Sequence, residues 1–209
     1  FSSLRMIEMD AKKTFEATLP LYRSNKEMQN NLKQLVTCYM AYRPDIGYVR
    51  GIAEVAGVLL LFSEPWVSFL CLTNLLNMPL FQGLYRFDWG VACNFISKYE
   101  KYLDFNLPAV AKHFKKTGVT SESYVCDWVK CIFGKILPLS IVCRIWDCFL
   151  FEGETFLIRA AVTVLTTRKH RILGANIDRC MENLNSLTLD LDAEMFFTTC
   201  FTVKTPAPQ

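Results

Sequence analysis

The chain has 209 residues, of which 52 % are hydrophobic and 21 % charged, so we expect a large buried core in one domain or two small subdomains. A formal net charge of only +3 argues against a DNA-binding domain. The strongest apolar run, residues 55–62, is too short to span a bilayer, and the first ten residues lack the apolar segment of a signal peptide.

The nine cysteines indicate reduced, buried thiols in a cytosolic protein. They are dispersed through apolar segments, their number is odd, and they never form a Cys-x-x-Cys pair. The two histidines, His113 and His170, are far apart in sequence. We therefore predict no metal site.

Apolar residues recur at helical spacing along the chain and strand-like alternation is almost absent, so we predict an all-α fold. The first predicted helices cover residues 26–42, 51–62 and 66–77. Proline cannot continue a helix, so we expect Pro44 to end the first of these and Pro79 to break the third.

The rest of the chain is predicted to form more short helices separated by glycine, proline and capping residues. These helices are expected over residues 87–103, 107–116, 120–133, 139–151, 154–167, 176–187 and 192–202. Many short helices with brief loops are typical of an irregular bundle rather than a coiled coil.

The most unusual segment is Tyr42-Arg-Pro-Asp-Ile-Gly-Tyr-Val-Arg-Gly51, which joins two apolar predicted helices. Polar and aromatic loops on a rigid helical frame often bind partners, and glycine allows a sharp turn or a close approach. The same residues also suit an ordinary turn between helices. A second segment, residues 7–13, places Asp10 and Lys13 three positions apart, where they can form a surface ion pair on a helix.

Together these segments resemble the TBC family of Rab GTPase-activating proteins, whose finger motifs read Ile-x-x-Asp-x-x-Arg and Tyr-x-Gln-Gly. The matching segments here are Ile7-x-x-Asp10-x-x-Lys13 and Tyr48-x-Arg50-Gly51. The likeness continues through Asp127-Trp128, Leu137-Pro138-Leu139 and Arg144-Ile145-Trp146-Asp147, and it spans about residues 4–200. Trp128 and Trp146 are expected to belong to the core.

The resemblance implies an irregular multi-helix TBC fold over residues 1–203, followed by a frayed tail at 204–209. No counterpart of the family's upstream Arg-x-x-x-Trp motif precedes Phe1. We therefore expect a TBC domain that is shortened at its N-terminus and lacks its first helices.

By the same resemblance, Lys13 and Arg50 occupy the two catalytic positions of the family. Residues expected to support the fingers and to bind the GTPase are Asp10, Arg43, Asp45, Tyr48 and Gly51. The family's arginine neutralises charge on the transferring phosphoryl group and accelerates hydrolysis by about 10³- to 10⁵-fold. Its glutamine orients the attacking water. Lysine lacks the bidentate guanidinium fork, and arginine has no hydrogen-bond acceptor. Both replacements therefore predict weak or lost activation.

Three functions remain open at this stage. The chain binds a Rab-type GTPase with little activation, or it activates a Rab through Lys13 and Arg50, or it is a helical scaffold without GTPase binding. We predict no cofactor, because GTP and magnesium arrive with the GTPase, and the near-balanced charge argues against a nucleic acid partner. The resemblance also implies a cytoplasmic regulator of vesicle traffic that is recruited to endomembranes.

Each of two clusters of basic residues has two possible interpretations. The clusters are His113 with Lys115 and Lys116, and Arg168-Lys-His-Arg171. Both lie near predicted helix C-termini, where the helix dipole favours positive charge. They are therefore either solvated helix ends or points of peripheral contact with acidic membrane lipids.

Overall fold

The computed structural model describes residues 25–186 and 191–207, and the regular elements in these ranges are α-helices and one short 3-10 helix. The all-α prediction is thereby confirmed for the described part of the chain. The chain divides into two compact units, residues 1–88 and residues 89–209.

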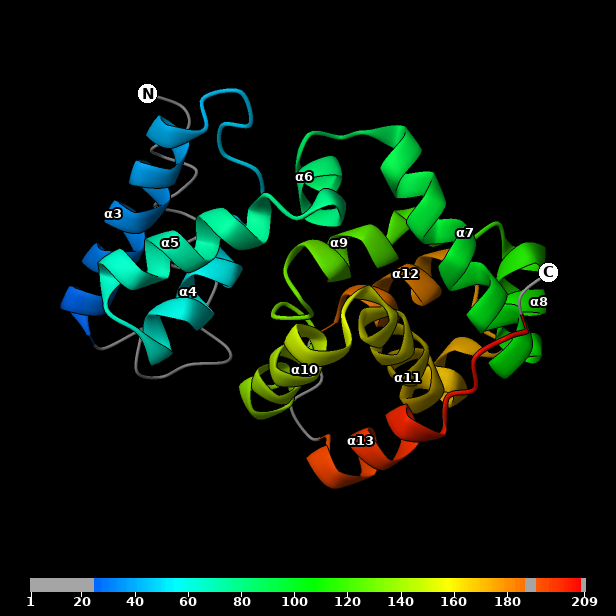
Figure 1. Cartoon of the computed structure of the whole chain (residues 1–209). Coiled ribbons are helices and arrows are strands. Elements are labelled where there is room, and N and C mark those ends of the chain that lie inside the picture. Colours follow the sequence, from blue (N-terminus) through cyan, green and yellow to red (C-terminus); the bar gives the residue numbers. More distant parts are fainter. Residues whose placement is uncertain (1–24, 187–190, 208–209) are drawn as a thin grey trace. The chain divides into compact units, whose positions relative to one another are not determined.

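The described part of the first unit consists of four helices (Figure 1). They are α3 (Lys26–Tyr42), α4 (Ile52–Phe62), α5 (Pro65–Leu76) and α6 (Pro79–Tyr85). The Asn25 side chain caps α3 by accepting hydrogen bonds from two backbone N–H groups of the first turn. The helices α3, α4 and α5 pack on one another, and the buried face of α3 repeats at helical spacing through Leu32, Leu35, Val36 and Tyr39.

The helix α6 is absent from the sequence prediction, which treated Pro79 only as a helix breaker. Pro79 is instead the first residue of α6, as Pro65 is the first residue of α5. Proline is well tolerated there because its missing N–H has no intrahelical acceptor in the first turn. The short helix is fixed by burial of Leu80, Phe81 and Leu84.

The second unit is built around one long central helix, α11 (Glu154–Ile172), which packs against α7, α8, α9, α10, α12 and α13 (Figure 1). The surrounding elements are α7 (Trp89–Asn106), α8 (Pro108–Thr117), η1 (Ser121–Ser123), α9 (Val125–Lys130), α10 (Leu139–Glu152), α12 (Ile177–Asn185) and α13 (Ala193–Thr202). The predicted helix 154–167 is five residues too short, because α11 continues to Ile172.

Large aromatic side chains hold the core of the second unit together. Trp128 and Trp146 are 2 % and 6 % exposed, so the prediction that they belong to the core is confirmed. The Trp128 indole N–H donates to the Leu184 carbonyl at 3.2 Å. The hydroxyls of Tyr99 and Tyr124 are hydrogen-bonded to each other at 2.9 Å. The buried polar atoms of Trp128, Tyr99 and Tyr124 therefore have partners, whereas the indole nitrogen of Trp146 has none among the described residues.

The helix predicted over residues 120–133 is broken into η1 and α9, and α9 ends at Lys130. Ile132 and Phe133 have positive φ angles, 43° and 62°, which cannot continue a helix. Such angles are unusual for bulky residues, and sequence gives no signal for them. Both side chains are fully buried, so packing holds the backbone in this conformation.

The prediction of buried thiols is only partly right. All nine cysteines are free thiols, and Cys131, Cys180 and Cys200 are buried, but Cys38 and Cys71 are exposed. Burial raises the pKa of the Cys200 thiol to about 12.

In the described residues, no single helix is both long and apolar enough to cross a membrane. The helices α5 and α6 meet that criterion only as a pair, and they are bent by 87° at the break between them.

Candidate functional site

The unusual polar segment forms a compact loop between α3 and α4. The Arg43 N–H closes α3 by donating to the Tyr39 carbonyl at 2.8 Å. The N–H groups of Ile46 and Gly47 both donate to the Arg43 carbonyl at 3.1 Å, which makes a tight turn. Gly47 has a φ of 67°, a conformation that glycine adopts without strain. The loop is therefore an ordered turn between two helices.

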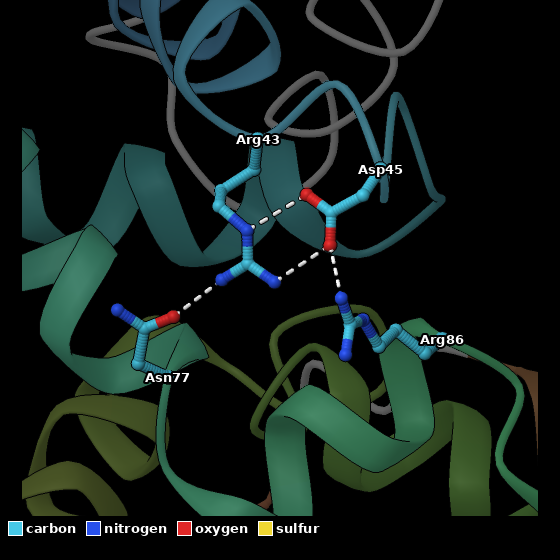
Figure 2. Close-up of polar contacts among 4 residues, drawn as sticks. All are labelled: Arg43, Asp45, Asn77 and Arg86. Carbon is cyan, nitrogen blue, oxygen red and sulfur yellow. Dashed lines mark hydrogen bonds and ion pairs between the residues drawn. The ribbon is translucent and has the colours of Figure 1, made fainter.

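Four side chains form a polar cluster that ties this loop to the rest of the first unit, and we call it the Asp45 clamp (Figure 2). Arg43 donates to both carboxylate oxygens of Asp45, from Nε to Oδ1 at 2.9 Å and from Nη2 to Oδ2 at 2.9 Å. Its remaining Nη1 donates to the amide oxygen of Asn77, at the end of α5. Arg86, which follows α6, also donates to Asp45 Oδ2. The clamp thus joins the loop to two further helices.

The charges of the clamp are fixed at neutral pH. The hydrogen bonds from Arg43, and then from Arg86, hold the pKa of the Asp45 carboxyl well below its usual range. In turn, the hydrogen bond to Asp45 raises the pKa of Arg43 above its already high value. Bidentate arginine–carboxylate pairs have a defined geometry, so this cluster orients the loop rather than titrating near pH 7.

The end of the loop presents an arginine to solvent. Arg50 is exposed, whereas its neighbours Val49 and Gly51 are buried and Tyr48 is half-buried. Gly51 has a φ of 110° and stands at the N-cap of α4, so the backbone reverses directly after Arg50. Because Val49 and Gly51 are buried, the exposed side chain of Arg50 projects from a stretch of backbone that is held in place on both sides.

The described residues contain one part of the predicted site. Arg43 and Asp45 contact each other directly, and Tyr48, Arg50 and Gly51 follow on the same loop. Asp10 and Lys13 lie outside the described residues. The prediction that Lys13 lies beside Arg50 therefore stays a prediction.

Two clamp residues and one buried acid escaped the sequence analysis. In the sequence Asn77 is only the last residue of a predicted helix, and Arg86 follows α6, a helix that the sequence pattern does not predict. Glu54 is only 6 % exposed although it lies in the first turn of the apolar helix α4. A carboxyl group four residues after Arg50, inside an apolar run, was the available signal for Glu54.

The structure changes the interpretation of both basic clusters. Arg168 is 3 % exposed and donates to backbone carbonyls, so it is a core residue and the expectation of a solvated arginine there is wrong. The His113 ring nitrogen Nε2 lies 2.9 Å from the Ala175 carbonyl oxygen, which makes His113 a link between α8 and the chain after α11. Within residues 25–186 and 191–207, no group of three or more acidic, histidine or cysteine residues is placed to hold a metal ion.

Comparison with known proteins gives a consistent result. The family model of the Rab-GTPase-TBC domain matches residues 2–173. TBC1 domain family member 14 of Homo sapiens is 33 % identical over 203 residues, which cover 97 % of this chain and 29 % of that protein. Drainin of Dictyostelium discoideum is 31 % identical over 186 residues, covering 89 % of this chain and 42 % of that protein. The chain thus spans less than half the length of these relatives.

Solved structures show the same fold. The Ypt/Rab-GAP domain of Gyp1p aligns with a TM-score of 0.76 at 19 % identity, covering 96 % of this chain and 72 % of that chain. The Chlamydomonas flagellar RabGAP TBC domain aligns with a TM-score of 0.75 at 23 % identity, covering 95 % and 66 %.

These matches, with the all-α fold, define the class of protein: a TBC domain of the Rab-GAP type. The chain belongs to the Rab-GTPase-TBC domain family. The two segments that carry the resemblance read Ile7-x-x-Asp10-x-x-Lys13 and Tyr48-x-Arg50-Gly51 in this sequence.

Proposed function

We propose that this TBC domain binds a GTP-loaded Rab-type GTPase and activates GTP hydrolysis weakly or not at all. The observation that carries the proposal is the loop of residues 43–51, which the Asp45 clamp fixes in place and which presents Arg50 to solvent. A preorganised loop lowers the entropic cost of binding a partner. In this proposal the GTPase supplies GTP and magnesium.

The proposed loss of activation follows from the chemistry of the two replaced positions. Arg50 has five donors and no acceptor, so it binds phosphate oxygens but does not orient an attacking water as a glutamine carbonyl does. Lys13 supplies a point charge without a bidentate fork. The pair therefore favours binding of the nucleotide-loaded GTPase over stabilisation of the transition state.

A second candidate is an active GTPase-activating protein in which Arg50 acts as a displaced finger. The exposure of Arg50 on a fixed loop supports it, because an arginine there meets a phosphoryl group in the way that an arginine finger does. A helical scaffold without GTPase binding remains the third candidate, and it gives the Asp45 clamp only a structural role.

We also propose that the domain works in the cytoplasm at the surface of endomembranes, where it regulates vesicle traffic. Its support is the set of exposed basic residues near the ends of α8 and α11. Lys115 and Lys116 lie in the last turn of α8, and Lys169, His170 and Arg171 lie in the last turn of α11. Basic clusters of this kind are attracted to acidic lipids.

Binding of a panel of Rab GTPases, each loaded with GDP or with a non-hydrolysable GTP analogue, tests the proposal. We expect at least one Rab to prefer the GTP state. Arg50→Glu should weaken that binding at least tenfold, which corresponds to about 1.4 kcal/mol. Lys98→Glu, a matched charge reversal at an exposed position of α7, should leave it within about twofold. If no Rab binds, or if both variants weaken binding equally, the proposed binding role of the loop is wrong.

A further inference from the structure

A cavity in the second unit lies between the end of α11 and the helix α12, away from the 43–51 loop in sequence. Its volume is about 580 Å³. Its lining includes Arg171, Arg179, Glu182, Asn183 and Ser186. The chain turns through Leu173, Gly174 and Ala175 at its edge, and Gly174 has a φ of 87°.

A buried arginine, Arg168, is hydrogen-bonded to the backbone of residues that line this cavity. Arg168 donates from Nη1 to the carbonyls of Asn183 and Leu184 at 2.8 and 2.9 Å. From Nη2 it donates to the carbonyls of Ser186 and Ile136 at 2.8 and 3.1 Å. The three bonds to Asn183, Leu184 and Ser186 fix the end of α12 against α11, so two lining residues, Asn183 and Ser186, are preorganised.

Two arginines and one glutamate line the cavity, so the formal charge of its lining is positive. Within the described ranges, Arg171 and Arg179 form no ion pair, although Glu182 lines the same cavity and Asp178 lies in the first turn of α12. Burial, and next the charge of Arg171, lower the pKa of Arg168 to about 10. Arg168 and Arg171 therefore repel each other, although burial is the larger cause of the lowered pKa. An anion bound there would relieve that repulsion.

Two exposed apolar side chains lie beside the cavity, where the chain passes from α11 to α12. Leu173 is 38 % exposed at the end of α11, and Ile177 is 43 % exposed at the start of α12. Lys169 and His170 add exposed basic groups on the preceding turn. Apolar tips beside basic residues are typical of surfaces that lie in the headgroup region of a membrane.

We infer that this cavity binds the phosphorylated headgroup of an anionic membrane lipid, with Arg171 and Arg179 on the phosphates and with Leu173 and Ile177 inserted beside it. This site gives the proposed membrane contact a defined location and ligand chemistry. It does not depend on whether the 43–51 loop binds a GTPase. Lys115 and Lys116 do not line it.

Co-sedimentation with phosphatidylcholine vesicles, with and without a phosphatidylinositol bisphosphate, tests the inference. The chain should bind only the vesicles that contain the bisphosphate. Arg171→Gln with Arg179→Gln should weaken this binding at least tenfold. Lys98→Gln with Lys101→Gln removes the same charge from exposed positions of α7 and should change it by less than about twofold. Equal weakening by both double variants, or no vesicle binding by the unchanged chain, would overturn the inference.

Soluble inositol trisphosphate separates a lipid headgroup from a free phosphate ligand. Leu173→Ser with Ile177→Ser should weaken vesicle binding while leaving inositol trisphosphate binding unchanged, because only the membrane offers an apolar phase. Binding of the soluble compound without vesicle binding would contradict a membrane ligand. Thermal unfolding of each variant checks the fold, and Rab binding by the same variants reports separately on the proposed function.

Discussion

Asp45 contacts one residue of its own loop, Arg43, and one residue from elsewhere in the first unit, Arg86. Arg43 is two residues away from Asp45, and the loop brings them together with two bonds of 2.9 Å. Asn77 and Arg86 are far from the loop in sequence, and they complete the clamp (Figure 2). The sequence sufficed to select Arg43 and Asp45, because they lie in one motif. It did not reveal Asn77 or Arg86, because their role depends on how α5 and α6 pack.

The low pKa of Asp45 predicts how the clamp contributes to stability at different pH values. A carboxyl group whose pKa is lower in the folded state stabilises the fold above its unfolded pKa, here 3.8, and this contribution is lost as the pH falls towards the folded value. We expect the difference in unfolding free energy between the wild type and Asp45→Asn to be constant from about pH 5 to 8 and to shrink below about pH 4.

Urea denaturation at a series of pH values measures this difference. Asp104→Asn is a suitable control, because it breaks a 3.2 Å pair with Lys115 in which the side chains are 54 % and 74 % exposed. It should change the unfolding free energy less than Asp45→Asn at neutral pH. A difference for Asp45→Asn that grows as the pH falls would contradict the assigned charge state.

At the scale of elements, one buried side chain organises the end of α12. Arg168→Met removes the four hydrogen bonds that Arg168 donates to backbone carbonyls of described residues, and it keeps a similar apolar stem. We expect a loss of about 2 to 4 kcal/mol in unfolding free energy, because the buried carbonyls lose a charged donor. Lys169→Met, at the exposed neighbouring position, should stay within about 0.5 kcal/mol. Chemical denaturation of the two variants distinguishes a structural arginine from a surface one.

The junction between α10 and α11 depends on the backbone of a single glycine. Gly153 ends one helix and begins the next with φ 75° and ψ −158°, a region that is almost exclusive to glycine. A Cβ atom there would meet nothing within 4 Å, so the cost of Gly153→Ala is backbone strain alone. We expect a loss of about 1 to 3 kcal/mol in unfolding free energy.

Gly118→Ala provides the matched control for this prediction. Gly118 caps α8 with φ 78° and ψ 17°, and a Cβ atom there also meets nothing within 4 Å. Its left-handed conformation is accessible to alanine at about 1 kcal/mol. Denaturation midpoints that place Gly118→Ala below Gly153→Ala in stability would contradict the strain assigned to the junction.

At the scale of the whole molecule, hydrophobic periodicity was sufficient to predict the all-α fold, and the helix bounds came close where a cap or a proline marks them. The prediction for α3 matches its observed range, Lys26–Tyr42, and the predicted helix 107–116 lies within one residue of α8, Pro108–Thr117. Periodicity failed where tertiary packing decides the backbone. The positive φ of Ile132 and Phe133, which ends α9, depends on their complete burial and leaves no pattern in the sequence.

The family was predictable because each of its motifs is a short, contiguous stretch of sequence. The match of the family model over residues 2–173 confirms the predicted family. Function is less determined by the fold, since it depends on the individual side chains of the site. In this chain we propose Lys13 and Arg50 as those side chains. The fold therefore supports a GTPase partner, and the proposed roles of Lys13 and Arg50 concern whether hydrolysis is accelerated.

The most direct test of this account is single-turnover GTP hydrolysis by a Rab that binds the domain, measured at saturating domain concentration. The unchanged chain should accelerate hydrolysis little, and Lys13→Arg with Arg50→Gln should raise the stimulated rate at least tenfold, or about 1.4 kcal/mol, because it restores the fork and the acceptor. Strong stimulation by the unchanged chain, or no gain in the double variant despite intact Rab binding, would contradict the account.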